Sequence, residues 1–308
     1  MQTQRLTLED LPENITTRLN TLSLFTSAGF AALWRAIDSV PVFWTVEKDN
    51  KILAVMPGVE RGRGILRRFQ SMPDGLYSRI MFAPDTGIDR REILRTLAAS
   101  LVSAGYMKLY INDYYRLFED RTGFNELVSK TTLVDISAAD WRPPDKKVQS
   151  EIRKAGREGV VVDDFNFEKH FEKFIQLMRQ TEQRHGRRPK YPARFFEALA
   201  RLAREDKRIR WVMVERGNEA ASSHIYFIDR DMVLNWQIYF NKKFSSLKPN
   251  QYILYTTARQ LAAQGVKYLN LGATPGDASG LETYKDKWGG ETYRYPCYRI
   301  KSFLGKLF

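Results

Sequence analysis

The sequence predicts a mixed α/β fold of the α+β class, arranged as two domains. The chain of 308 residues is longer than one average domain, and its 43% hydrophobic and 28% charged residues are typical of a globular protein. Segments with strand periodicity alternate with segments of helical periodicity. In each half a predicted helix ends at a glycine and a strand follows directly, at Gly105 and residues 106–110 and again at Gly265 and residues 266–270. This parallel predicts an internal duplication.

The first half is expected to contain a helical N-terminus, a hairpin, a helix and a strand. Apolar residues recur at mixed helical spacings until Pro41 breaks the pattern. Residues 48–51 have the composition of a hairpin turn. Asp89 can cap the next helix and Gly105 can end it. We therefore predict helices over residues 1–40 and 89–104, and strands over residues 42–46, 52–56 and 107–111.

A basic, glycine-containing segment, Arg61-Gly62-Arg63-Gly64, follows the predicted hairpin. Its glycine amides could hold a phosphate. Because no strong helix pattern follows it, we favour a basic surface loop.

The second half is expected to begin after a proline-rich boundary. Pro143 and Pro144 exclude a helix at residues 141–145, so we place an N-terminal domain at 1–142 and a C-terminal domain at 143–308. Turn signals at 216–218 and 229–231 separate three strands. The predicted order is a basic helix at 146–158, a strand from 160, helices at 167–183 and 193–205, strands at 210–216, 220–229 and 232–240, a helix at 249–263, a strand at 268–271, a loop at 272–280, a short helix to 288 and a strand at 292–300.

The charge and cysteine content limit the classes of partner. A net charge of +13 favours anionic partners, whether nucleic acid, an anionic membrane or phosphorylated small molecules. The single cysteine, Cys297, excludes an intramolecular disulfide framework and is expected to be a buried thiol. The three histidines lack metal-binding spacings, so no metal is expected. Without a signal-like N-terminus or a long apolar stretch, we expect a cytoplasmic protein, with peripheral attachment at the inner membrane surface as an alternative.

Three segments of the second half resemble the FemABX and BioF2-like branch of the GNAT acyltransferase superfamily. The first is the run Val148-Gln149-Ser150-Glu151-Ile152-Arg153-Lys154-Ala155-Gly156-Arg157-Glu158-Gly159-Val160. The second is Gly265-Val266 to Leu269-Asn270-Leu271-Gly272, in which Asn270 stands where the family commonly has an acid. The third is Leu281-Glu282-Thr283-Tyr284-Lys285-Asp286-Lys287-Trp288-Gly289-Gly290, similar to an aromatic-lysine segment that ends in two glycines. These segments cover about the last 160 residues; the first half is similar mainly in layout.

The resemblance implies two tandem GNAT-like domains, each with a mostly antiparallel mixed sheet flanked by helices. It places acyl transfer to an amine in the second domain, while the first is degenerate and serves as a support or an acceptor-binding domain. It implies acyl-CoA as a cosubstrate, no tightly bound cofactor, and an acceptor amine on a cell-wall or surface-polysaccharide precursor. The transferred group would then be other than aminoacyl.

The resemblance also gives candidate catalytic residues. Lys285 would stabilise the acceptor or the developing charge as a cation, with a solvated helix lysine as the alternative, and Tyr284 would pack at the same opening or in the core. The strand at 234–240 alternates and is predicted to place three polar side chains on one face, next to the donor or towards solvent: Asn235, Gln237 and Tyr239. Tyr239 is the third catalytic candidate, whereas Asn235 and Gln237 are candidates to bind the donor or the attacking amine.

Two further segments could bind the substrates. The place of the GNAT pyrophosphate loop lacks its usual glycines, which leaves CoA binding in doubt, but a helix beginning near Pro249 could still bind phosphate through its free amides; the candidates are Lys242, Lys243, Ser245, Pro249, Asn250 and Gln251. A basic loop could bind an anionic acceptor, or it could be a solvated surface; its candidates are Arg184, His185 and Tyr191. His224 could be a base, but we favour a hydrogen-bonded core histidine.

Two other functions stay open. One is an aminoacyl-tRNA-dependent ligase of the peptidoglycan-bridge kind, which the positive charge favours, although no inserted coiled-coil arm is seen. The other is a non-catalytic binder of nucleic acid or a membrane surface. No helix-turn-helix, RNP or zinc signature supports it, and the aromatic residues follow the periodicity of core positions.

Overall fold

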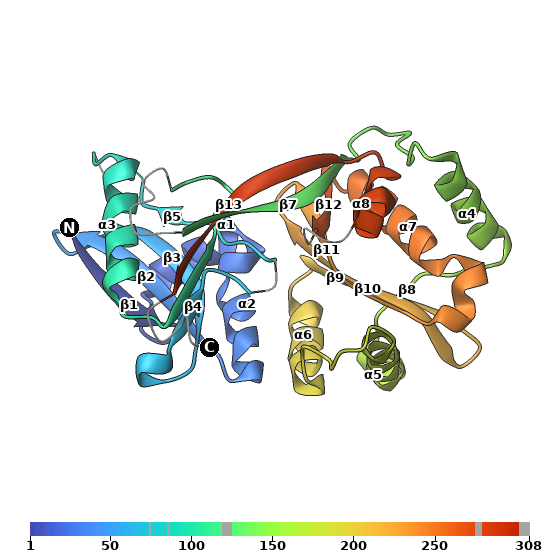
Figure 1. The fold of residues 1–308 in the computed structure, drawn as a ribbon, viewed down its shortest axis with the longest axis horizontal. Coiled ribbons are helices and arrows are strands. Elements are labelled where there is room, and N and C mark those ends of the chain that lie inside the picture. The colour runs from blue at the N-terminus through green and yellow to red at the C-terminus, as the bar shows by residue number, and fades with distance from the viewer. Residues whose placement is uncertain (74, 85–86, 119–124, 275–278, 302–308) are drawn as a thin grey trace. The chain divides into compact units, whose positions relative to one another are not determined.

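The computed structural model describes residues 1–73, 75–84, 87–118, 125–274 and 279–301, and it confirms the mixed α/β fold class. The described chain forms two compact units (Figure 1). Unit 1 contains residues 1–129 and the residues from 294 onward, and unit 2 contains residues 130–293. The division between the units therefore falls between residues 129 and 130 and again between 293 and 294, whereas the sequence predicts one domain boundary, between residues 142 and 143. Two strands, β7 (Asn125–Asp135) and β13 (Glu291–Lys301), contribute residues to both units.

The sheet of unit 1 has the order β1-β2-β3-β4-β6-β13, with β5 paired to β3. All these pairs are antiparallel except β4 and β6, which are parallel. Helix α3 lies between these two strands in the chain and packs its buried leucines on one face of the sheet. In chain order, the elements that precede β7 are β1 (Gln2–Thr7), α1 (Glu13–Leu22), η1 (Leu24–Thr26), α2 (Ala28–Leu33), η2 (Trp34–Ile37), β2 (Val40–Lys48), β3 (Lys51–Arg61), η3 (Gly64–Leu66), β4 (Arg68–Gln70), β5 (Met81–Phe82), α3 (Arg90–Ser103) and β6 (Lys108–Asn112).

The sheet of unit 2 has the order β7-β12-β11-β10-β9-β8 and likewise contains one parallel pair, β11 and β12. Helix α7 lies between them in the chain, as α3 does in unit 1. The elements are α4 (Lys146–Arg157), β8 (Asp163–Asp164), α5 (Phe167–Arg184), α6 (Ala193–Glu205), β9 (Ile209–Arg216), β10 (Glu219–Asp229), β11 (Met232–Phe240), η4 (Lys242–Leu247), α7 (Pro249–Ala263), β12 (Tyr268–Ala273) and α8 (Ser279–Asp286).

Helices cover both faces of the sheet in unit 2. Val212 of β9 packs in the core cluster that contains the buried residues of α7. Its neighbour Trp211 points to the other face, where its ring lies 4.7 Å from that of Phe174 in α5. Figure 1 shows α7 and the pair α5 and α6 on opposite faces of these strands. The sheet is therefore buried on both faces, and a site is expected where its strands end or separate.

Two expectations for secondary structure were wrong. Residues Gln2–Thr7 form β1, which pairs antiparallel with β2, rather than the start of a helix. This strand alternates in burial and gains its backbone partners only from a distant segment, so tertiary pairing outweighs the local helical spacing. In addition, no strand was predicted at residues 125–135, which form β7 and pair with β12. In the described part of the chain, no helix is long and apolar enough to cross a membrane.

Candidate active site

The parallel pair β11 and β12 separates partway along its length. Their register joins Met232 to Tyr268, Val233 to Leu269 and Leu234 to Asn270, and it ends there. Strand β11 continues beside β10 to Phe240, while Ala273 of β12 pairs with Thr131 of β7. The carboxyl-terminal ends of two parallel strands therefore part from each other, which is a common position for a ligand in a sheet with helices on both faces.

A β-bulge lies on β11 at the same level. Opposite β10, Tyr226 pairs with Asn235 and Ile225 pairs with Gln237, so Trp236 is the extra residue. The predicted strict alternation is therefore wrong: Trp236 and Tyr239 both pack against aromatic rings of the segment 174–196. A bulge inserts one residue and changes which side chains share a face.

The side chains predicted on this strand have different surroundings. Asn235 is buried, and its Oδ1 has no hydrogen-bond partner among the described residues. Gln237 is half-buried. Tyr239 lies in the aromatic core, with its ring 5.3 Å from Phe174. Because a buried polar atom without a partner is costly, Asn235 Oδ1 is a candidate acceptor for a ligand hydrogen.

Lys285 is buried rather than solvated, with 2% of its surface exposed. Its Nζ donates to Gly272 O at 2.5 Å, to Ala273 O at 3.2 Å and to Thr274 Oγ1 at 2.8 Å. The ammonium therefore binds the end of β12 to α8. Burial lowers the pKa of Lys285 to about 8, although Glu282 opposes this shift.

A polar cavity of about 260 Å³ lies beside Lys285. It is lined by four threonines, by Asp286, and by Lys130 and Glu282, which form an ion pair. Next to it Asn270, at the position where the family commonly has an acid, accepts from Thr131 Oγ1 at 2.5 Å and from Gly272 N at 2.9 Å. The asparagine thus holds the turn at the end of β12. The middle of the predicted loop at 272–280 lies outside the described residues.

Tyr284 faces the core of unit 2. Its ring lies 6.3 Å from that of Trp288, and it packs on the cluster that α4 and α7 share with the sheet. Burial raises the pKa of Tyr284 to about 12, so its hydroxyl stays protonated at neutral pH.

The segment predicted to bind the cofactor forms η4 and the first turn of α7. Lys242, Lys243 and Ser245 are exposed, and Lys243 forms an ion pair with Glu219. In the described part of the chain no side chain caps α7, whose first helical residue is the buried Pro249. The helix therefore presents amides to solvent near exposed cations, while Gln251 is half-buried beside them.

Asn250 points inward instead. Its Oδ1 accepts from Ser222 Oγ at 2.5 Å and lies 3.3 Å from His224 Nε2. On its other side His224 Nδ1 lies 3.0 Å from the hydroxyl of Tyr226. The expectation of a hydrogen-bonded core histidine is confirmed. Burial lowers the pKa of His224 to about 4, so the ring is neutral at pH 7.

This buried histidine is expected to make stability fall in acid. The unfolded chain binds a proton near pH 6.5 but the folded chain only near pH 4, so the free energy of unfolding decreases as pH falls from about 6.5 to 4, by up to about 3 kcal/mol. Urea unfolding at pH 7, 5.5 and 4.5 should show a shallower loss for His224→Gln than for the wild type. The exposed His185→Gln serves as the control and should keep the wild-type dependence; equal slopes for all three proteins would contradict the prediction.

The three candidates for acceptor binding lie in different surroundings. Arg184 is exposed and donates from Nη1 to Phe240 O at 2.7 Å, at the end of β11. His185 is exposed, whereas Tyr191 is buried and stacks on Phe195 with ring centroids 4.3 Å apart. Arg184 is therefore the member of this group that lies at the end of β11.

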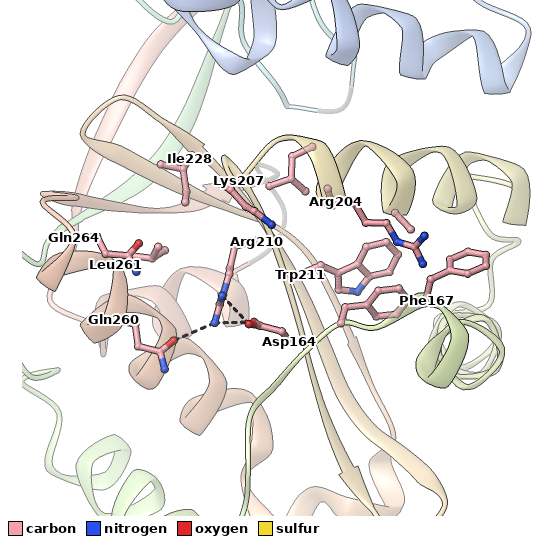
Figure 2. A pocket seen from close by; sticks show the side chains of 14 residues that line it. Asp164, Phe167, Arg204, Lys207, Arg210, Trp211, Ile228, Gln260, Leu261 and Gln264 are labelled. Carbon is pink, nitrogen blue, oxygen red and sulfur yellow. Dashed lines mark hydrogen bonds and ion pairs between the residues drawn. The ribbon is translucent and has the colours of Figure 1, made fainter.

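A second cavity, of about 370 Å³, lies at the other end of the same sheet (Figure 2). This cavity is lined in part by Ile228, next to the turn between β10 and β11. The candidate active site lies nearer the other end of β11, towards Phe240. In Figure 2 Arg210 reaches Asp164, with an Nη2–Oδ1 distance of 2.7 Å, and Gln260 at 3.4 Å. Sequence reasoning missed this cavity; the basic run at residues 204–210 was its signal. In the described residues, no cluster of three His, Cys, Asp or Glu could hold a metal ion.

Comparison with known proteins finds a family model that matches most of unit 2. The family model of the acetyltransferase (GNAT) domain matches residues 145–286, which lie within unit 2. No curated protein matches the chain in sequence. The fold matches the crystal structure of FemX with a TM-score of 0.68 and 13% identity, over 96% of this chain and 97% of that chain.

Two other solved structures share the fold. The C-terminal domain assigned to a lysylphosphatidylglycerol synthetase of Agrobacterium fabrum has a TM-score of 0.64 and 13% identity, over 91% of this chain and 90% of that chain. A tandem GNAT protein from the clavulanic acid biosynthesis pathway has a TM-score of 0.59 and 11% identity, over 97% of this chain and 98% of that chain. The chain therefore has a GNAT-type acyltransferase fold. The predicted resemblance to the FemABX-like branch is confirmed.

Proposed function

We propose that the chain is an N-acyltransferase that transfers an acyl group from acyl-CoA to an amine on a cell-wall or surface-polysaccharide precursor. The observation that carries this proposal is the separation of β11 and β12 beside the unpartnered Oδ1 of Asn235. An extended donor that carries an amide N–H can complete the hydrogen bonding of this strand end. The match of residues 145–286 to an acetyltransferase domain supports acyl-CoA as the cosubstrate.

Transfer to an amine needs an uncharged nitrogen, a fixed donor carbonyl and stabilisation of the tetrahedral oxyanion. The amine nitrogen attacks the carbonyl carbon, the bond to the donor sulfur breaks, and the nitrogen loses a proton. In our proposal Asn235 and Gln237 orient the donor or the amine. Lys285 supplies positive charge at the end of β12, and Tyr284 and Tyr239 shape the site from the core.

The phosphates of the donor are assigned to the start of α7. The free amides of its first turn and the positive end of the helix dipole favour an anion, and Lys242 and Lys243 add charge. Ser245 and Gln251 contribute polar groups, whereas Asn250 supports the turn from inside through Ser222. In this proposal Arg184 contacts the acceptor at the end of β11, with His185 beside it.

A second candidate is aminoacyl transfer from tRNA. The segment 241–251 contains no glycine, so the flexible phosphate cradle typical of CoA binding is absent from the sequence. A donor held mainly by its RNA would not need that cradle, and the charge of +13 favours RNA phosphates. One structural neighbour is itself assigned to lysylphosphatidylglycerol synthesis, for which the aminoacyl group is lysyl.

Thermal unfolding with a panel of donors tests these candidates. A ligand that binds only the folded state raises Tm, by about 5 °C at a concentration near 100 Kd. We expect a saturable shift with one acyl-CoA that Lys242→Glu weakens and the distant Lys207→Glu leaves unchanged. A shift only with aminoacyl-tRNA would replace the first candidate with the second, and no shift with either donor class would contradict both.

A further inference from the structure

One face of the sheet in unit 1 carries a row of cationic side chains. In the register of the strands, Arg61 of β3 lies opposite Arg68 of β4, and Arg68 lies beside Lys108 of β6. Side chains alternate along a strand, so the intervening residues Phe69 and Leu109 point to the other face, where they join the core cluster of α3. The cations thus share the face that α3 does not cover.

This cationic row lines a cavity of about 490 Å³. Arg299 joins Arg61, Arg68 and Lys108 around it, and none of the described residues that line it is acidic. Like charges directly opposite on neighbouring strands destabilise a sheet. A bound anion would offset that repulsion, so the cavity is chemically suited to phosphate groups.

The hairpin that joins β3 to β4 adds exposed apolar side chains next to this cavity. At its tip, Ile65 is 71% exposed and Leu66 is 50% exposed. Arg63 precedes them, and the whole segment 61–68 contains no acidic residue. Exposing two neighbouring aliphatic side chains to water is unfavourable. Aliphatic side chains next to arginines are typical of a surface that contacts a lipid headgroup layer.

We propose that this hairpin docks unit 1 on an anionic phospholipid membrane. Ile65 and Leu66 enter the headgroup layer, while Arg61, Arg63, Arg68 and Arg299 bind lipid phosphates. A nucleic acid would also satisfy the arginines, but it would leave the two aliphatic side chains exposed; a membrane accounts for both features. Docking does not depend on the transfer reaction and extends beyond it.

Cosedimentation of the full chain with vesicles tests this surface. Binding is expected to vesicles of phosphatidylglycerol and phosphatidylcholine, to weaken with added salt, and to be absent with phosphatidylcholine alone. Each arginine near an anionic surface contributes about five-fold in affinity, so Arg61→Gln/Arg68→Gln should bind about 25-fold more weakly. Ile65→Ser/Leu66→Ser should bind about ten-fold more weakly at unchanged charge. Arg153→Gln/Arg157→Gln, on exposed positions of α4, removes the same charge and should bind like the wild type.

A second measurement tests the repulsion without lipid. Arg68→Gln should raise Tm by a degree or two in the absence of vesicles, because it removes the positive charge that lies between Arg61 and Lys108. The proposal would be overturned if the chain bound neutral and anionic vesicles equally well. It would also be overturned if the hairpin variants and the α4 variant lost the same amount of vesicle binding. Hairpin variants that lose tRNA binding but keep vesicle binding would also overturn it, in favour of a nucleic-acid surface.

Discussion

Lys285→Met is expected to lower kcat by about 10²- to 10³-fold, the range for removal of one group that stabilises developing charge. The methionine fills similar volume but removes the hydrogen bonds that Lys285 Nζ donates to Gly272 O and Ala273 O. Steady-state rates with the donor that raises Tm measure the effect. Lys287→Met, two residues away on the same segment, is the matched control and should keep wild-type turnover.

The pH dependence separates two roles of this lysine. Burial lowers its pKa to about 8, so if the cation is the active form, kcat falls as pH rises through 8. Lys285→Arg, which keeps the positive charge, should retain activity above that pH. An activity that rises through pH 8 would instead make the neutral amine the active form, and unchanged turnover in Lys285→Met would remove the residue from the mechanism.

Stability should change much less than turnover. The folded-state pKa is below the unfolded value near 10.5, so burial of the charge opposes folding below pH 8, and this cost disappears as pH rises towards 10. Methionine removes that cost along with three hydrogen bonds. The two changes oppose each other, so a large loss of activity with a similar Tm is the expected pattern.

The elements that follow local rules were predictable from the sequence. Asp89 accepts from Arg91 N at the start of α3, as its capping role predicts. Gly105 and Gly265 both have positive φ, 71° and 92°, and each lies between a helix and a strand of a parallel pair. The predicted parallel between the two halves therefore corresponds to the same strand–helix–strand arrangement in both units.

The features that depend on distant pairing were not predictable. The bulge at Trp236 exists only in the register of β10 and β11, so the alternation of the strand placed Tyr239 with Asn235. The row formed by Arg61 and Arg68 likewise appears only when β3 is aligned with β4. Sequence patterns give the periodicity within one strand, whereas these features need the partner strand.

The candidate site was predictable in part for the same reason. Resemblance selected Lys285, but its contacts with the end of β12 depend on how α8 packs beside that strand. Asn250 was selected for the start of a helix, where it lies, yet its side chain turns towards Ser222. Position along the chain placed these residues; the direction of each side chain depends on the packing around it.

Gly290→Ala is expected to lower the free energy of unfolding by about 2–3 kcal/mol, the usual cost of inserting a methyl group into closely packed structure. A Cβ at Gly290 would lie 2.4 Å from Thr132 Cγ2, 3.0 Å from Val134 Cγ2 and 3.1 Å from Leu133 O. The first two atoms belong to β-branched side chains with restricted rotamers, and the third is backbone. Urea unfolding measures the loss. The close approach of β7 therefore gives a physical reason for glycine at the end of this segment.

Gly280→Ala provides the matched control. A Cβ at Gly280, in α8, meets no atom of the described residues within 4 Å, so alanine should be neutral or stabilise by up to about 1 kcal/mol through its helix propensity. Thr132→Ser removes the methyl group nearest to Gly290, so the double variant Gly290→Ala/Thr132→Ser should recover about 1 kcal/mol relative to the sum of the single changes. Additive effects, or equal stability of Gly290→Ala and Gly280→Ala, would show that β7 does not approach this glycine as closely as described. Recovery in the double variant would show that the contact with Thr132, rather than backbone flexibility, requires the glycine.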